Sequence, residues 1–176
     1  VRDGDAADGT YHCVETPSDM KADTHKKMNP PLRTKRDRYA MITALIDGTI
    51  DTIATDHAPH SAEEKSKPFD QAPFGIIGLE TSFAVSHTEL VKKGFINPMR
   101  LIALMSTNAA RILGYDGGTL RVGARADIAV IDPKEEWTVN AENFKSKGRN
   151  TPFEGMKLTG RVWLTMADGN VIYRKE

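Results

Sequence analysis

The chain has 176 residues, and 24 Lys and Arg are balanced by 24 Asp and Glu, so its formal net charge is zero. This balance, without a run of like charges, excludes the strongly basic surface typical of nucleic-acid-binding proteins. No apolar run approaches the length of a membrane-spanning helix, and the single cysteine, Cys13, excludes an internal disulfide. These features predict a soluble cytoplasmic protein that binds neither nucleic acid nor a membrane.

The first 26 residues contain few structural signals. Residues 1–9 are rich in Asp, Gly and Ala and have no apolar periodicity, so we expect a disordered start. Residues 11–16 are compatible with a short strand that contains His12 and Cys13. These two residues lack a second pair at the spacing of a zinc site, so the pattern favours an ordinary role over metal binding.

The segment Asn29-Pro30-Pro31 is predicted to be extended, because each proline disfavours helical geometry in the residue before it. Such a segment holds the Asn29 amide, a hydrogen-bond donor and acceptor, in a fixed place. The plain alternative is a loop that leads into a helix, since Thr34 can cap the first turn. The residues themselves favour this alternative.

A helix and a strand are predicted next. Apolar residues recur at helical spacing over residues 36–46, and Gly48 provides a stop signal. Residues 49–54 are apolar and β-branched, which predicts a buried strand. A helix joined to a strand by a short turn is one unit of a parallel α/β sheet.

A polar cluster of Asp56, His57 and His60 follows this strand directly. Pro59 has no N–H group for a sheet ladder, so the cluster is expected where the strand leaves the sheet. In an α/β barrel, catalytic groups collect at the carboxyl ends of the strands, where a carboxylate can bind a metal or act as a general base. The alternative is a structural strand end with a solvated loop.

The next part combines a loop, a turn and a helix. Residues 61–71 are polar and charged, which predicts a surface loop that is a plausible lid. Residues 72–75 predict a tight turn, in which Gly75 leaves the backbone open to a ligand. A helix is predicted over residues 78–91, with His87 as an ordinary packing or surface residue. Its expected core contacts are Leu79, Phe83, Leu90 and Val91.

A second helix is predicted to begin at Asn97, which can cap it, and Pro98, which fits its first position. Its expected apolar face consists of Met99, Ile102, Ala103, Met105 and Ala109. Strands are predicted over residues 128–131 and 137–139. A hairpin with a turn at Asp168 and Gly169 is predicted at the end of the chain.

Four stretches of this sequence together resemble the dihydroorotases of the amidohydrolase superfamily. They are residues 27–33, 52–60, 72–80 and 146–155. The resemblance implies an α/β fold: the C-terminal part of a metal-dependent (β/α)8 amidohydrolase barrel, followed by part of the small β-sandwich domain. It implies a partial barrel with the last catalytic strand over residues 27–114 and the β-domain over residues 115–176, with residues 1–26 matching poorly.

The resemblance also implies an activity and a set of site residues. Dihydroorotases catalyse the reversible, zinc-dependent hydrolysis of the cyclic amide of dihydroorotate, a small molecule, to carbamoyl aspartate in pyrimidine biosynthesis. Asp56 matches the carboxylate that binds zinc and carries the proton, and His60 matches the residue that holds the substrate carboxylate. Asn29 and backbone groups of Phe74 and Gly75 match the groups that contact the substrate.

The other metal ligands of the family have no counterpart in this sequence, and one carboxylate does not make a zinc site of about four ligands. The chain begins at Val1 and is shorter than the roughly 250 residues of a complete barrel. We therefore expect an incomplete portion that is inactive by itself. Its exposed apolar faces predict self-association into a homo-oligomer.

Two alternatives remain open. The first is a hydantoinase-like or allantoinase-like cyclic-amide hydrolase, although those enzymes generally lack the Asn-Pro-Pro segment and the histidine that matches His60. The second is a non-catalytic scaffold with a dihydroorotase-like fold. The sequence indicates no particular role for His57.

Overall fold

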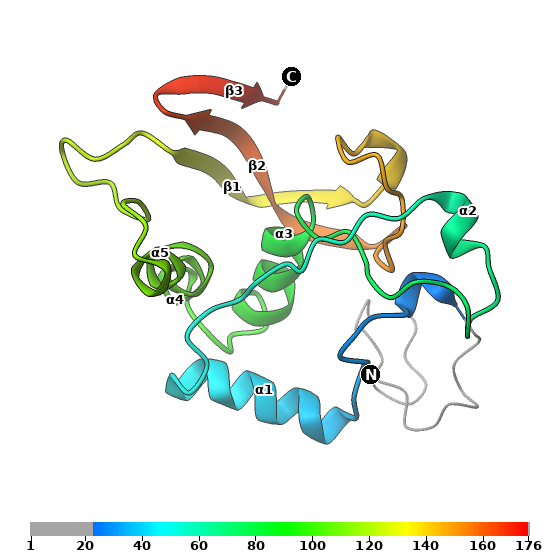
Figure 1. Ribbon diagram of the computed structural model, residues 1–176. Coiled ribbons are helices and arrows are strands. Elements are labelled where there is room, and N and C mark those ends of the chain that lie inside the picture. Colours follow the sequence, from blue (N-terminus) through cyan, green and yellow to red (C-terminus); the bar gives the residue numbers. More distant parts are fainter. Residues whose placement is uncertain (1–22, 176) are drawn as a thin grey trace. The chain divides into compact units, whose positions relative to one another are not determined.

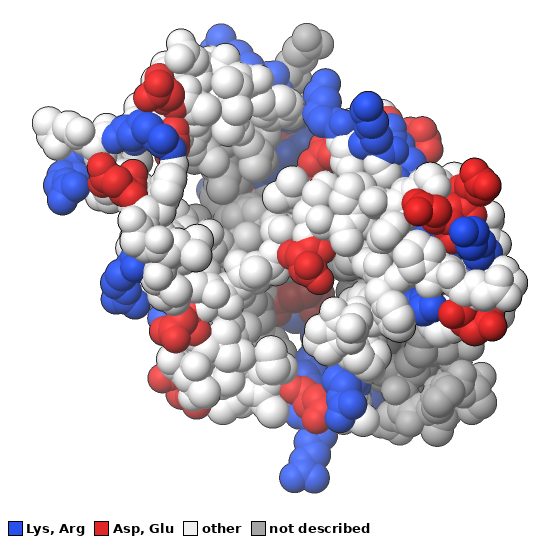
Figure 2. All heavy atoms as spheres, viewed as in Figure 1, with Lys and Arg blue, Asp and Glu red and all other residues white. Residues whose placement is uncertain are grey.

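The computed structural model describes residues 23–175 (Figure 1). The start predicted to be disordered, the strand predicted over residues 11–16 and the pair His12 and Cys13 lie outside the described residues. No helix among the described residues is long and apolar enough to cross a membrane. On the face drawn in Figure 2, acidic and basic side chains are interspersed.

The chain divides into two compact units, and each unit combines three segments of the sequence. Unit 1 comprises Val1–Ala44, Thr55–Ser82 and Thr138–Lys157. Unit 2 comprises Leu45–Ala54, Phe83–Trp137 and Leu158–Glu176. The predicted domain boundaries after residues 26 and 114 stay a prediction.

Short helices and loops make up most of unit 1. Its elements are η1 (Thr24–Lys26), most of α1 (Lys35–Asp47), α2 (Ala62–Lys65) and η4 (Ala141–Asn143). The predicted cap of α1 is present: Thr34 Oγ1 accepts from the Asp37 N–H at 3.3 Å, and Asp37 Oδ2 accepts from the Thr34 N–H at 3.2 Å. The Thr34 hydroxyl, which also donates to Asp37 Oδ2 at 3.0 Å, and the Thr34 N–H lower the pKa of Asp37. The helix ends at Asp47 and is followed by Gly48, which has φ 90°.

The predicted surface loop over residues 61–71 contains a helix, so this prediction was incomplete. Ser61 caps α2 through its hydroxyl, which accepts from the Glu64 N–H at 3.1 Å, and Glu64 Oε2 accepts from the Ser61 N–H at 2.9 Å. This reciprocal capping box follows from the spacing of Ser and Glu, a signal present in the sequence. Lys65 ends the helix and is only 3% exposed.

The predicted strand over residues 49–54 is not a strand in the structure. Residues 49–56 have no strand assignment, and their backbone is held by separate contacts, such as Ile53 N–H donating to Leu104 O at 3.0 Å. A strand needs a neighbouring strand to complete its ladder. Within residues 23–175, this part of the chain forms one isolated parallel bridge, between His57 and Ile76.

Two helical segments carry most of the core of unit 2. The first combines α3 (Ser82–Ser86) with a π-helical turn, η2 (His87–Val91), and the second combines α4 (Pro98–Ile102), a π-helical turn η3 (Ala103–Thr107) and α5 (Asn108–Leu113). The first begins at Ser82 rather than at Gly78. The reason is a turn in which Gly78 O accepts from the N–H groups of Thr81 and Ser82. Leu79 lies in this turn and is 65% exposed, so it is not the predicted core contact.

The second helical segment begins as predicted and buries a different face. The Asn97 side chain accepts from the Arg100 N–H at 2.8 Å, and Pro98 occupies the first turn. Leu101 and Leu104 are fully buried, whereas Met99 is 75% exposed, which corrects the predicted face. Apolar residues occur around most of this helix, so their periodicity did not identify the buried side.

Residues 128–174 contain a three-stranded sheet with strand order β1-β2-β3. Its strands are β1 (Ile128–Thr138), β2 (Lys157–Ala167) and β3 (Asn170–Arg174). The predicted hairpin is confirmed: β2 and β3 pair antiparallel, and Asp168 and Gly169 turn with φ 49° and 78°. The strands predicted over residues 128–131 and 137–139 form one continuous strand, β1. Pro133 does not interrupt it, because β1 lies at the edge of the sheet, where a proline is tolerated.

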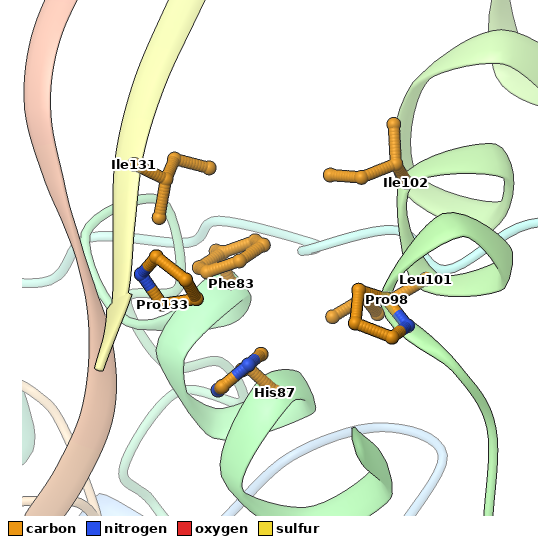
Figure 3. Close-up of a pocket in the computed structure, with 7 residues that line it drawn as sticks. All are labelled: Phe83, His87, Pro98, Leu101, Ile102, Ile131 and Pro133. Carbon is orange, nitrogen blue, oxygen red and sulfur yellow. The ribbon is translucent and has the colours of Figure 1, made fainter. Parts of the chain in front are cut away.

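His87 is a packing residue, as predicted. It is 5% exposed, its Nδ1 lies 3.2 Å from Thr159 O, and its ring stacks on Phe83 with centroids 5.6 Å apart. Gly160 permits this approach, because a Cβ there would lie 2.9 Å from the Phe83 ring. Both rings also line an apolar pocket of about 150 Å³ (Figure 3). The other lining residues are Pro98, Leu101, Ile102, Ile131 and Pro133.

Candidate active site

Asp56 has a backbone conformation that is uncommon for its residue type. Its φ is 44°, in the left-handed region, and its side chain is exposed. Non-glycine residues in this region are rare, with Asp and Asn among the exceptions, and they cluster at functional sites. Asp56 thus combines an uncommon backbone conformation with an exposed carboxylate, directly after residues 49–55.

His57 binds the neighbouring turn of unit 1 rather than pointing freely into solvent. Its Nδ1 accepts from the N–H of Gly78 at 3.1 Å and lies 3.4 Å from the N–H of Leu79. An Nδ1 that accepts hydrogen bonds carries no proton, so a neutral ring has its proton on Nε2. His57 thus fixes the turn that begins at Gly78, a role the sequence did not indicate.

His60 is held by both ring nitrogens and by its backbone. Its Nε2 lies 2.9 Å from Phe74 O and must be the donor, since a carbonyl only accepts. Its Nδ1 lies 3.6 Å from Glu64 Oε2, and its N–H donates to Asn150 Oδ1 at 3.0 Å. The pKa of Glu64 is lowered mainly by hydrogen bonds from Ser61 and less by the charge of His60.

Gly75 occupies a place that no larger residue can take. It has φ 125°, and a Cβ there would lie 2.6 Å from the Cβ of Ala58 and 3.3 Å from His60 Nε2. The turn predicted over residues 72–75 lies earlier in the chain, at residues 69–71, and residues 73–75 have no turn assignment. Gly75 nevertheless lies directly against the segment that carries His60. Three of the predicted site residues, His60, Phe74 and Gly75, come together in unit 1.

The backbone groups of Phe74 and Gly75 are almost all used within the protein. Phe74 O accepts from His60, Gly75 N–H donates to Lys27 O at 2.9 Å, and Gly75 O accepts from Lys65 Nζ at 3.0 Å. Among residues 23–175, Phe74 N–H is the one polar group of these four without a hydrogen-bond partner. It is therefore the group that remains available to a ligand.

Asn150 is the residue that sequence reasoning missed. It is 2% exposed, and its Nδ2 donates to Ala58 O at 2.8 Å and to Gly75 O at 3.2 Å. Its own backbone O accepts from Ile77 N–H at 3.0 Å. Together with the bond from His60, these contacts join three segments of unit 1. The sequence signal was present in the stretch 146–155, although no role was attached to it.

Asn29 and Asp56 have no hydrogen bond to the other three predicted residues. Asn29 precedes a cis peptide bond to Pro30 and is exposed, two residues after Lys27, whose carbonyl binds Gly75. Within the described part of the chain, the Asn29 side chain makes no hydrogen bond. Its predicted role in substrate binding stays a prediction.

The described residues do not fit a closed metal site. Residues 23–175 contain no group of three or more His, Cys, Asp and Glu side chains placed to hold a metal ion. Asp56 would contribute one carboxylate, whereas a zinc site takes about four ligands, or three and a water molecule. A metal site would therefore need ligands in addition to those within residues 23–175.

Comparison with known proteins identifies the family. The sequence profile of the amidohydrolase family matches residues 6–172, beginning well before Lys27, and the chain therefore belongs to this family. The dihydroorotase of Caldanaerobacter subterraneus subsp. tengcongensis is 55% identical over 153 residues, which cover 87% of this chain and 35% of that protein. The dihydroorotase of Bacillus cereus (strain Q1) is 47% identical over 94% of this chain and 39% of its own length.

Solved structures of related enzymes share the fold of this chain. The L-hydantoinase of Arthrobacter aurescens matches with a TM-score of 0.82 and 34% identity, over 88% of this chain and 35% of that chain. The D-hydantoinase of Thermus sp. matches with a TM-score of 0.78 and 32% identity, over 86% of this chain and 34% of that chain. The chain thus spans little more than a third of the length of the proteins it matches.

Proposed function

We propose that this chain is the substrate-side part of a dihydroorotase, which hydrolyses the cyclic amide of dihydroorotate reversibly to carbamoyl aspartate. The observation that carries the proposal is identity of 47–55% to dihydroorotases over most of the chain. The hydantoinase structures, by contrast, are 24–34% identical. Because the chain spans about a third of its relatives, this activity is proposed for the whole protein and not for the isolated chain.

The proposed roles follow the geometry of unit 1. In its doubly protonated form, His60 would hold the substrate carboxylate by donating from Nδ1, since Nε2 donates to Phe74 O. Glu64 Oε2 lies 3.6 Å from His60 Nδ1, and the substrate carboxylate would displace it from this contact. Phe74 N–H would donate to a substrate oxygen, and Asn29 would add an amide contact.

Asp56 would carry the proton between the attacking water and the leaving nitrogen, because an exposed carboxylate can both accept and release it. Its second proposed role is to bind zinc, which would supply an activated hydroxide when bound. The remaining ligands would come from outside residues 23–175. The structural likeness to hydantoinases supports a proposed partial (β/α)8 barrel over residues 27–114 and a partial β-sandwich over 115–176.

A chimeric enzyme tests the proposed function. The aligned 153-residue segment of the Caldanaerobacter dihydroorotase would be replaced by the matching residues of this chain. We expect kcat/KM for dihydroorotate to stay within about tenfold of the recipient enzyme, equivalent to about 1.4 kcal/mol. Hydantoin should be hydrolysed far more slowly. Spectrophotometric assays of both substrates, together with the zinc content, provide the measurement.

Each alternative predicts a different result for the same chimera. A folded, zinc-loaded chimera that prefers hydantoin would replace the proposal with a hydantoinase-like function, for which the TM-score of 0.82 is the supporting observation. A folded, zinc-loaded chimera without either activity would favour a non-catalytic scaffold. The recipient enzyme, purified in parallel, is the control for folding and metal loading.

Self-association is proposed for the isolated chain, together with a cytoplasmic location that the single cysteine supports. Large apolar side chains are exposed on described elements of both units. Examples are Tyr39 at 59%, Leu113 at 79% and Leu120 at 83% exposed. Contiguous apolar patches mark surfaces that associate, and exposed side chains of this kind are the candidates for forming one. Sedimentation velocity should show species larger than one chain, and a single monomeric boundary at micromolar concentration would contradict this.

A further inference from the structure

Two lysines lie buried beside the candidate site in unit 1, and the proposed function assigns them no part. Lys27 is 7% exposed and Lys65 is 3% exposed. Buried lysines are rare because removing an ammonium group from water is costly unless a partner compensates. Within the described part of the chain, neither ammonium lies within ion-pair distance of a carboxylate.

Backbone carbonyl oxygens, rather than a carboxylate, accept the hydrogen bonds of the Lys27 ammonium group. Lys27 Nζ donates to Phe69 O at 2.6 Å, Asp70 O at 3.3 Å and Ala72 O at 2.6 Å, so all three of its protons are used. It also lies 4.5 Å from the centroid of the Phe74 ring. The face of an aromatic ring attracts a cation, which adds to the compensation.

Lys65 continues this arrangement along the same loop. Its Nζ donates to Pro73 O and to Gly75 O, both at 3.0 Å. The carbonyl loop, which we define as residues 69–75, thus turns five carbonyl oxygens toward two ammonium groups. Burial and the nearby charge of Lys27 lower the pKa of Lys65, so the protein holds two like charges together at an energetic cost.

The carbonyl loop carries the groups that place His60. Phe74 O receives the hydrogen bond from His60 Nε2, and Gly75 N–H is fixed on Lys27 O. A loop held through its carbonyls cannot rotate Phe74 O away without breaking bonds to an ammonium group on either side. The orientation of the His60 ring therefore depends on the two lysines.

We propose that Lys27 and Lys65 are positioning residues, which fix the carbonyl loop so that His60 and Phe74 N–H are aligned for the substrate. The relevance to substrate binding rests on the proposed function. The ordering of the loop itself does not, because it follows from the hydrogen bonds in unit 1.

Hydrogen exchange of the full chain tests the ordering. In Lys65→Met, a side chain of similar length keeps the packing and removes the donors to Pro73 O and Gly75 O. We expect the amides of the carbonyl loop, including Gly75 N–H, to exchange at least about tenfold faster by mass spectrometry. Amides in the middle of α1 should exchange at their original rate. Lys27→Met is a second variant and should have the same local effect.

Lys67→Met is the matched control, because Lys67 is exposed in the same segment and should leave the exchange of the loop unchanged. Unchanged exchange of the loop in both Lys65→Met and Lys27→Met would overturn the proposal. Faster exchange spread evenly over the described residues would overturn it as well, since that result would indicate a general loss of stability.

Kinetics in the chimera separate positioning from a merely structural role. A positioning role predicts that Lys65→Met raises KM for dihydroorotate about tenfold and changes kcat less than about threefold. An unchanged KM in an active chimera would overturn the assignment to substrate binding. If the unsubstituted chimera is inactive, the proposed function fails, and the exchange experiment still decides whether the lysines order the loop.

Discussion

Replacing Asp56 by asparagine in the chimera should lower kcat for dihydroorotate by about 10³-fold or more. An amide cannot carry a proton as a carboxylate does, and general acid–base catalysis contributes about 10²–10⁴-fold. The fold should persist, because asparagine also adopts the left-handed conformation that Asp56 has at φ 44°. Steady-state kinetics and the thermal midpoint, measured on the same preparation, check both parts.

Asp51→Asn is the control for this substitution. Asp51 is exposed like Asp56, and its backbone carbonyl accepts from Asn108 Nδ2 at 2.8 Å. Among residues 23–175, the Asp51 carboxylate makes no hydrogen bond. It should leave kcat unchanged within about twofold, since substitutions away from special features have small effects. An Asp56→Asn chimera that keeps a tenth or more of the original kcat would exclude the proposed role of Asp56.

Asn150→Asp should produce a large loss of stability in the full chain. The substitution keeps the size of the side chain but removes the donors to Ala58 O and Gly75 O and places negative charge against both oxygens. At 2% exposure, an unpaired charge of this kind should lower the free energy of unfolding by about 3–5 kcal/mol at neutral pH. Urea denaturation with a common m-value measures the loss.

The loss of stability in Asn150→Asp should depend on pH in a definite direction. Burial raises the pKa of the introduced carboxyl above its value in the unfolded chain, so the folded state binds a proton more readily than the unfolded state. The loss should therefore shrink as pH falls, because protonation restores one donor. Asn143→Asp, at an exposed position, is the control and should change the stability by less than about 0.5 kcal/mol. A similar loss at both positions would contradict the central role of Asn150.

Local features of the fold were predictable from the sequence. The cap of α1 at Thr34, the start of α4 at Asn97 and Pro98, and the turn at Asp168 and Gly169 each depend on residues within a few positions. Capping and tight turns are decided by short-range hydrogen bonds and by permitted backbone angles. For that reason the pattern and the structure agree at these places.

Long-range contacts explain most of what the sequence did not reveal. Asn150 binds carbonyls 92 and 75 residues away, and Lys27 binds carbonyls more than 40 residues away. Lysines are ordinarily surface residues, so neither Lys27 nor Lys65 gave a signal of burial. The prediction of a strand over residues 49–54 was wrong for a related reason. A strand depends on neighbouring strands to pair with, and a local sequence pattern does not contain them.

The sequence suggested residues for the candidate site, and it predicted their geometry only in part. The resemblance of the four stretches named His60, Phe74 and Gly75, which the structure brings together. It did not indicate that three of the four backbone polar groups of Phe74 and Gly75 are already bonded within the protein. That detail required the three-dimensional path of the carbonyl loop.

The segments of the two units alternate along the sequence, which limits the effect of proteolytic cleavage and of genetic insertion or deletion. The polypeptide passes from one unit to the other five times, at residues 44/45, 54/55, 82/83, 137/138 and 157/158. No single cleavage therefore releases either unit, and no one insertion or deletion adds or removes a whole unit. During synthesis, unit 1 is incomplete until residue 157 has been made, after most of unit 2 has left the ribosome's active centre.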